Sequence, residues 1–244
     1  LSLAEAEQIT AEAEAAQTTL IIHENFRFQP WYREAKAFLD AGHMGQVYSA
    51  RFALRPGDGR GPEAYLARQP SFQQMPRFLV QETAVHFIDT FRWLFGPITS
   101  VYADLRQLNP VIAGEDTGTL LLTHTTGAQS VFDGNRLSDH VADNPRMTMG
   151  EMMIEGEGGV LCVDGFGNLT FRAFGAQTRD PVPITGPVDA TQFGGGCVDA
   201  LNAHVVAALS QGQTPENTAR DYLDVIRVCE AAYLSHTEGR RITL

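Results

Sequence analysis

The stretch QETAVHFIDTFRWLFG, residues 81–96, predicts one amphipathic helix that ends at Gly96. Glu82, His86 and Asp89 stand at positions i, i+4 and i+7, so they project from the same side of that helix. The rest of the helix surface is mostly apolar, which argues against an ordinary solvent-facing stripe. A carboxylate one turn from an imidazole suits proton transfer near neutral pH. The stretch therefore predicts an acid–base pair held among apolar residues.

The segments around this helix predict an α+β fold. After residue 97 the chain alternates apolar and polar residues between short turns, which is typical of hairpins in a mostly antiparallel sheet. We expect strands at 46–54, 98–107, 116–124, 128–136, 147–155, 159–163, 168–174 and 241–244. Further helices are expected at 31–41, 193–211 and 216–237, and long loops at 55–76 and 175–192. The fold class is thus an open, mostly antiparallel sheet with helices on one face.

The beginning of the chain follows another pattern. Ser2 and Glu5 form the sequence of a capping box, and a helix is expected from there to about Gln17. Residues 18–23 are β-branched or apolar on both faces, as in a buried parallel strand. A helix followed by such a strand is half of a βαβ unit. We therefore expect residues 1–24 to be the end of a doubly wound domain and residues 25–244 to form a second domain.

Composition excludes several classes of function. The formal net charge is −11 and no basic cluster is present, so a nucleic-acid partner is not expected. No apolar run approaches the roughly 20 residues of a membrane span. Three scattered cysteines without metal-ligand spacing indicate reduced thiols and a cytoplasmic protein. Lys36 is the only lysine, on an expected solvated helix face, so a mechanism that needs a catalytic lysine must find it outside this chain.

The expected sheet predicts a partner subunit. Four apolar residues on its alternating strands were assigned to the face away from the helices: Val101, Leu120, Leu122 and Val131. An apolar face without a cover in its own chain favours association. We therefore expect a homodimer, or a tetramer built from dimers.

The order of elements and three segments resemble the C-terminal two-thirds of the glucose–fructose oxidoreductase/inositol dehydrogenase family (Gfo/Idh/MocA). Residues 24–30, ENFRFQP, are similar to the family's segment that leaves the last Rossmann strand. Residues 82–96 are similar to its acid-x-Gly-Val-His-x-x-Asp helix with the trailing Trp-Leu-x-Gly, although Ala84 replaces the usual glycine and Glu82 the usual aspartate. Residues 231–240 resemble its closing Ala-x-x-Ser-x-x-x-Gly-Arg.

This resemblance implies an activity and a fold. Members of the family oxidise or reduce a carbinol carbon of a sugar, inositol or related polyol with NAD or NADP, and their second domain has the dihydrodipicolinate-reductase-like C-terminal fold. Their glycine-rich phosphate loop and Glu-Lys-Pro segment lie in an N-terminal Rossmann domain. Both are expected upstream of Leu1, in roughly a hundred further residues. The chain by itself is therefore expected to bind no dinucleotide and to be inactive.

The resemblance also implies roles for individual residues. His86 would exchange the hydroxyl proton during hydride transfer, and Glu82 would orient His86 or bind the substrate hydroxyl. Asn25 and Arg27 would lie near the nicotinamide or the substrate. Three further residues are candidates for substrate binding: Arg77, Gln81 and Tyr65, the last as a cover over the pocket.

Two other readings remain open from the sequence. The chain is also compatible with a non-enzymatic binding or scaffold protein that keeps the sheet domain. The chain could also be a metal-dependent hydrolase or isomerase that uses Glu82 and His86. A single histidine is an incomplete set of metal ligands, so no metal is expected. Asp89 is expected to be structural, bonded to backbone or an arginine.

Overall fold

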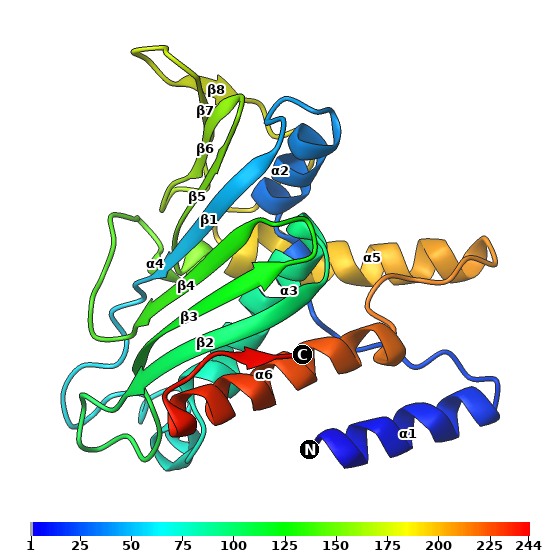
Figure 1. The fold of residues 1–244 in the computed structure, drawn as a ribbon, viewed down its shortest axis with the longest axis vertical. Helices are drawn as coiled ribbons and strands as arrows, with labels where there is room; N and C mark the ends of the chain where they lie inside the picture. The colour runs from blue at the N-terminus through cyan, green and yellow to red at the C-terminus, as the bar shows by residue number, and fades with distance from the viewer. Residues whose placement is uncertain (1) are drawn as a thin grey trace.

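The computed structural model describes residues 2–244 and contains one open nine-stranded sheet (Figure 1). Its strands are β1 (Val47–Leu54), β2 (Ile98–Arg106), β3 (Thr117–His124), β4 (Gln129–Asn135), β5 (Gly150–Gly156), β6 (Gly159–Val163), β7 (Leu169–Ala173), β8 (Asp180–Val182) and β9 (Ile242–Thr243). They are ordered β8-β7-β6-β5-β1-β4-β3-β2-β9. Only β1 and β4 are parallel neighbours. The predicted mostly antiparallel sheet is confirmed.

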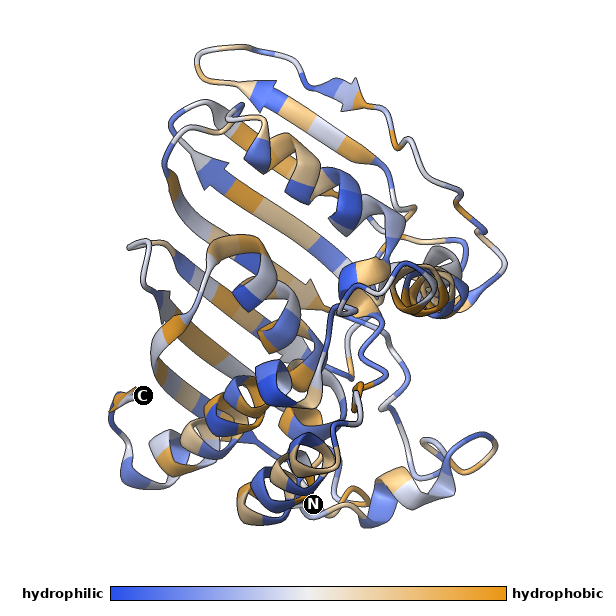
Figure 2. Ribbon diagram, turned by 90° about the vertical axis from the view of Figure 1, so that its right-hand side faces the viewer, coloured by the Kyte–Doolittle hydropathy of each residue, from blue (hydrophilic) through white to orange (hydrophobic). Residues whose placement is uncertain are grey.

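The helices gather on one face of this sheet, as Figure 2 shows, with the helices in front of the strands. They are α1 (Leu3–Ala15), α2 (Pro30–Asp40), α3 (Val85–Phe95), α4 (Pro145–Thr148), α5 (Cys197–Ser210) and α6 (Ala219–Glu238). Their ends follow the sequence signals: Ser2 and Glu5 form the capping box of α1, and Gly96 ends α3 at φ +91°. No helix among residues 2–244 has the length and apolar character needed to cross a membrane.

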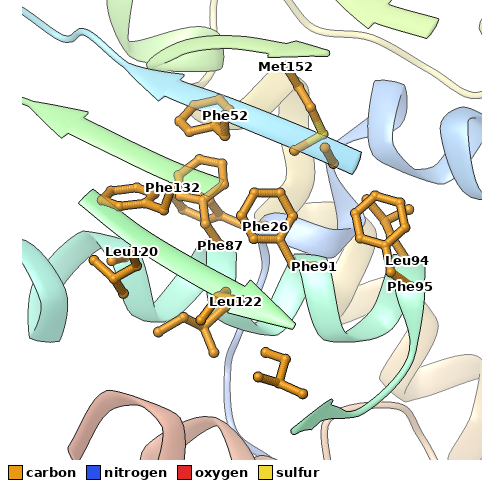
Figure 3. Packing of buried hydrophobic residues seen from close by; sticks show 14 of the residues in the cluster. Phe26, Phe52, Phe87, Phe91, Leu94, Phe95, Leu120, Leu122, Phe132 and Met152 are labelled. Atoms are coloured by element: carbon orange, nitrogen blue, oxygen red, sulfur yellow. The ribbon is translucent and has the colours of Figure 1, made fainter. Parts of the chain in front are cut away.

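A cluster of aromatic rings fills the space between α3 and the sheet (Figure 3). Phe87 of α3 is fully buried, and its ring centroid lies 3.7 Å from Phe52 of β1 and 5.6 Å from Phe132 of β4. Phe26 packs edge-on against Phe87 at 5.3 Å. Burying one such side chain stabilises a fold by roughly 1.5–3 kcal/mol. This packing fixes α3, and with it the residues of the acid–base site, relative to the sheet.

The two faces of the sheet differ from the prediction at three positions. Val101, Leu120 and Leu122 are fully buried in the core that the helices cover, and Val131 is the one of the four that lies on the open face. The pleat explains this, because residues two apart share a face and Val101 is paired with Leu122. The open face instead carries exposed Tyr102 and Met153 among charged and polar side chains.

The N-terminal segment and two short elements also differ from the prediction. Residues 18–23 do not form a buried strand: the segment makes one antiparallel bridge, Ile21 to Thr218, and is exposed or half-buried. A buried parallel strand needs neighbours on both sides, and the sheet of residues 2–244 offers it none. The start of the strand expected at 147–155 is helix α4, and β8 lies within the expected loop 175–192.

Candidate active site

The helix of the acid–base pair begins with an irregular turn. Residues Leu79–Ala84 are π-helical, and the regular α3 starts at Val85. Glu82 therefore stands on a wider turn than His86, and π turns of this kind are frequent at functional sites. Glu82 does not bond His86: its carboxylate accepts from Arg136 and from the Thr83 hydroxyl. The expected orientation of His86 by Glu82 is thus wrong.

The carboxylate that contacts His86 belongs to Glu24. Its Oε2 lies 2.6 Å from His86 Nδ1, and Glu24 itself is only 2 % exposed. The Tyr222 hydroxyl donates to the same oxygen at 2.9 Å, and the Phe26 backbone N–H donates to Oε1 at 3.0 Å. The Phe26 ring stacks on the imidazole with 4.2 Å between centroids and 15° between planes. The imidazole is therefore held by a buried carboxylate on its edge and an aromatic ring on its face.

This contact sets the protonation of both partners. Burial alone lowers the pKa of His86, but the Glu24 carboxylate more than offsets it, with smaller contributions from Glu82 and Asp89, so the pKa of His86 is raised. Burial raises the pKa of Glu24, but the charge and hydrogen bond of His86 outweigh it and the pKa of Glu24 is lowered. A carboxylate at Nδ1 selects the tautomer with its proton on that nitrogen, which leaves Nε2 as the acceptor.

His86 lines a cavity of about 190 Å³. No side chain of residues 2–244 is hydrogen-bonded to His86 Nε2. The cavity is smaller than the roughly 300–1,000 Å³ of a typical drug-sized site, which favours a small polar molecule. Its polar walls come from Asn25, Asp58, Gln69, Glu82, Thr83 and three arginines.

A larger cavity, about 560 Å³, lies between α2, α5 and residues 185–196. Its lining is mainly apolar, and no histidine or cysteine belongs to it. Volume alone would favour this cavity. The smaller cavity is the candidate active site, because of the two it alone contains an imidazole paired with a buried carboxylate.

Arg136 organises the wall opposite His86. Its side chain is 1 % exposed, contacts Glu82 and lies 3.2 Å from Asp58 Oδ2, and its guanidinium lies 4.4 Å from the Phe78 ring centroid. Tyr65 donates to Asp58 at 3.0 Å and adopts φ +67°, a strained conformation for a residue with a large side chain. Arg136 is thus buried between the carboxylates of Asp58 and Glu82, and its contact with Glu82 holds that side chain in the cavity wall.

Some of the other predicted site residues line the cavity, and others lie outside it. Asn25 lines the cavity, and Tyr65 lies behind its wall against Arg136. Arg27 does not line it: the guanidinium is buried in an ion pair with Asp89, with Nε 2.8 Å from Oδ2. The expected structural role of Asp89 agrees with this pair.

Arg77 and Gln81 also lie outside the cavity lining. Arg77 donates to Glu230 at 2.7 Å and stacks on Tyr233, and Gln81 is exposed. The sequence analysis missed Glu24, Asp58 and Arg136 as site residues. Only Glu24 has a local signal in the sequence, an acidic residue two positions after an apolar run; Asp58 and Arg136 are brought to the site by the fold. Among residues 2–244, no group of three His, Cys, Asp or Glu is placed to hold a metal ion.

Comparisons with known proteins agree with this fold. The profile of the GFO/IDH/MocA C-terminal domain matches residues 32–161. The chain is 33% identical over 251 residues to D-apiose dehydrogenase of Paraburkholderia graminis, covering 100% of this chain and 64% of the relative. It is 28% identical over 249 residues to D-apiose dehydrogenase of Rhizobium rhizogenes, covering 100% of this chain and 69% of that protein.

A solved structure is similar over nearly the same range. It is an oxidoreductase from Agrobacterium radiobacter in complex with NAD+, L-tartaric acid and magnesium, with a TM-score of 0.85 and 26% identity over 99% of this chain and 70% of that chain. The fold of this chain is thus shared with an oxidoreductase that was solved with NAD+ bound. The chain belongs to the GFO/IDH/MocA family. It spans about two thirds of the length of these relatives.

Proposed function

We propose that this chain supplies the substrate half of an NAD(P)-dependent oxidoreductase that acts on a CH–OH group of a sugar, inositol or related polyol. One observation carries the proposal: a buried carboxylate holds His86 by Nδ1 at the wall of a small polar cavity and leaves Nε2 without a partner among residues 2–244. In this proposal residues 25–244 form the substrate domain and residues 1–24 belong to a dinucleotide-binding domain, which holds the cofactor phosphates.

The chemistry follows from the protonation of His86. Nε2 accepts the proton of the substrate hydroxyl as the carbinol carbon is oxidised to a carbonyl, and the imidazolium that forms is stabilised by the Glu24 carboxylate. A bound nicotinamide would supply the acceptor for the hydride. Glu82 and Asp58, anchored on Arg136, accept hydrogen bonds from neighbouring substrate hydroxyls and orient the reacting carbon.

The residues around His86 fit a nicotinamide ring at one end of the cavity. Phe26, Met149 and Phe193 are apolar residues of the cavity lining, suited to the face of a planar aromatic ring, and the Asn25 amide is suited to its carboxamide. We assign these four residues to the ring end of the cofactor. Arg27 is not included, because its ion pair with Asp89 turns the guanidinium away from this wall.

Two measurements together test the proposal. Calorimetry on the 244-residue chain is expected to show no binding of NAD(H) or NADP(H), because the phosphate-binding loop is assigned to the other domain. The protein that joins both domains is expected to reduce NAD+ or NADP+ with a polyol or sugar, and D-apiose is the first to assay because the curated relatives act on it. Micromolar dinucleotide binding by the chain would refute the domain division. A two-domain protein that is inactive with sugars, polyols and their carboxylic acids alike would favour the scaffold hypothesis.

We further propose that the chain forms a homodimer, or a tetramer of such dimers, through the open face of the sheet. Tyr102 and Met153 are exposed there, and no helix of residues 2–244 covers this face. Light scattering is expected to give at least twice the 26.7 kDa mass of the chain. The variant Tyr102→Asp should shift the population toward monomer, because it places a charge in the apolar part of the interface. A monomeric unmodified chain at micromolar concentration would contradict the proposal.

A further inference from the structure

The cavity at His86 contains more positive charge than its own carboxylates neutralise. Three arginines line it, Arg68, Arg136 and Arg146, but only two carboxylates, Asp58 and Glu82. The third nearby carboxylate, Glu24, is committed to His86. Three guanidiniums against two carboxylates leave an excess of one positive charge facing the space where a ligand would lie.

The excess is located on Arg68 and Arg146. Both carboxylates bind the buried Arg136, and Arg68 reaches only Asp58, at 3.6 Å. Arg146 of α4 has no carboxylate within ion-pair distance among residues 2–244 and lies 5.7 Å from the centroid of the Phe193 ring. Burial and the charge of Arg68 lower the pKa of Arg146, and the charges of Asp58 and Glu82 offset this only in part. Because Arg68 and Arg146 line the same cavity, an anion bound there would give Arg146 the ion pair that it lacks within residues 2–244.

The wall beside them contains buried polar atoms without partners. Gln69 Oε1 and Arg136 Nε accept or donate no hydrogen bond within residues 2–244. The Gln69 side chain also lines the cavity, although its Oε1 atom is itself buried and does not face the open space. The cavity thus combines an imidazole, carboxylate acceptors for hydroxyls, and two arginines of which only Arg68 has a carboxylate within ion-pair distance.

We propose that Arg68 and Arg146 bind a carboxylate of the substrate, so that among sugar-derived polyols a polyhydroxy acid, such as an aldonic or uronic acid, is preferred over a neutral compound. This rests on the proposed function, because it assigns the other end of the same molecule to His86. A carboxylate is favoured over a phosphate because it carries a single negative charge, which matches the excess of one positive charge, and because the cavity holds only about 190 Å³.

Calorimetry on the 244-residue chain tests this with two ligands that share a six-carbon polyol skeleton, D-gluconate and D-glucitol. Gluconate is expected to bind at least about 10-fold more tightly, equivalent to about 1.4 kcal/mol. The preference should weaken at high salt, since the two arginines are partly exposed. Arg68→Gln and Arg146→Gln should each reduce it. Arg241→Gln, at an exposed arginine next to β9, is the matched control and should keep it.

Equal affinities for the two ligands, no binding of gluconate, or a preference that survives in the double variant Arg68→Gln/Arg146→Gln would overturn the proposal. Inorganic phosphate that binds as tightly as gluconate, with loss in the same variants, would show an anion site that is not selective for carboxylate and would also overturn it. These readouts need no redox reaction. An inactive two-domain protein whose substrate domain still prefers gluconate would therefore refute the proposed function separately.

Discussion

Replacing His86 with alanine is expected to lower kcat/KM of the two-domain protein by at least about 10²-fold, the lower end of the contribution of a positioned general base. The loss should appear mainly in kcat, because the imidazole acts on the proton during the chemical step and the hydroxyl-binding carboxylates remain in place. Cofactor reduction followed by absorbance gives both constants. The fold should persist, because His86 is 28 % exposed in its side chain and its neighbours Phe87 and Ile88 carry the core contacts.

The matched control is His23→Ala. His23 is exposed, bonds Asn202 at 3.1 Å and does not line the cavity, so its removal should leave turnover within about twofold of the unmodified protein. Near-normal turnover in His86→Ala would remove this residue from the mechanism and with it the assignment of the cavity as the reaction site.

The variant Glu24→Gln is expected to have the second largest effect. The amide keeps the shape of the side chain but can donate a proton to Nδ1, which would move the imidazole hydrogen to Nε2 and remove the base. In catalytic triads, the same exchange at the orienting carboxylate costs roughly 10⁴-fold in kcat. We expect a fall of about 10²-fold or more here. Tyr222→Phe removes one hydrogen bond to Glu24 and keeps the carboxylate, so its loss should be much smaller; equal losses would indicate damaged packing instead.

The same pair predicts how activity and stability depend on pH. Only neutral His86 accepts a proton, so the rate should fall as pH decreases through its raised pKa, and this limb should move to lower pH in Glu24→Gln. The raised pKa of His86 increases the free energy of unfolding. This increase is fully present below the unfolded-state pKa of about 6.5 and is lost as pH rises through the pKa of the folded protein. The lowered pKa of Glu24 likewise increases the free energy of unfolding. This increase is present above the unfolded-state pKa of about 4.3 and is lost as pH falls through the pKa of Glu24 in the folded protein.

Most of the fold could be predicted because it depends on local patterns. Strands β2, β3, β4, β6 and β7 lie within two residues of their predicted bounds, and the caps at Ser2 and Gly96 were identified by residue type. It was harder to predict which side chains of each strand face the helices. Assigning Val101, Leu120 and Leu122 to the open face failed because alternation separates two faces without saying which one the helices cover.

The site could be predicted only in part. His86 was identified from its helix, but its partner was not, since Glu24 is 62 residues away in the chain and lies beside Nδ1 where Phe26 packs against α3. The i, i+4 spacing favoured Glu82, and the π turn at Leu79–Ala84 together with Arg136, 54 residues further on, draws that carboxylate away. Long-range ion pairs of this kind have no periodic signature in a sequence.

The most direct test of the account is a titration of the His86 imidazole by ¹H–¹⁵N NMR in the 244-residue chain, with Glu24→Gln as the comparison. The account predicts a pKa above the ordinary value of about 6.5 and a neutral form protonated at Nδ1, and it predicts that Glu24→Gln lowers this pKa. A His86 pKa at or below 6.5 that Glu24→Gln leaves unchanged would contradict it.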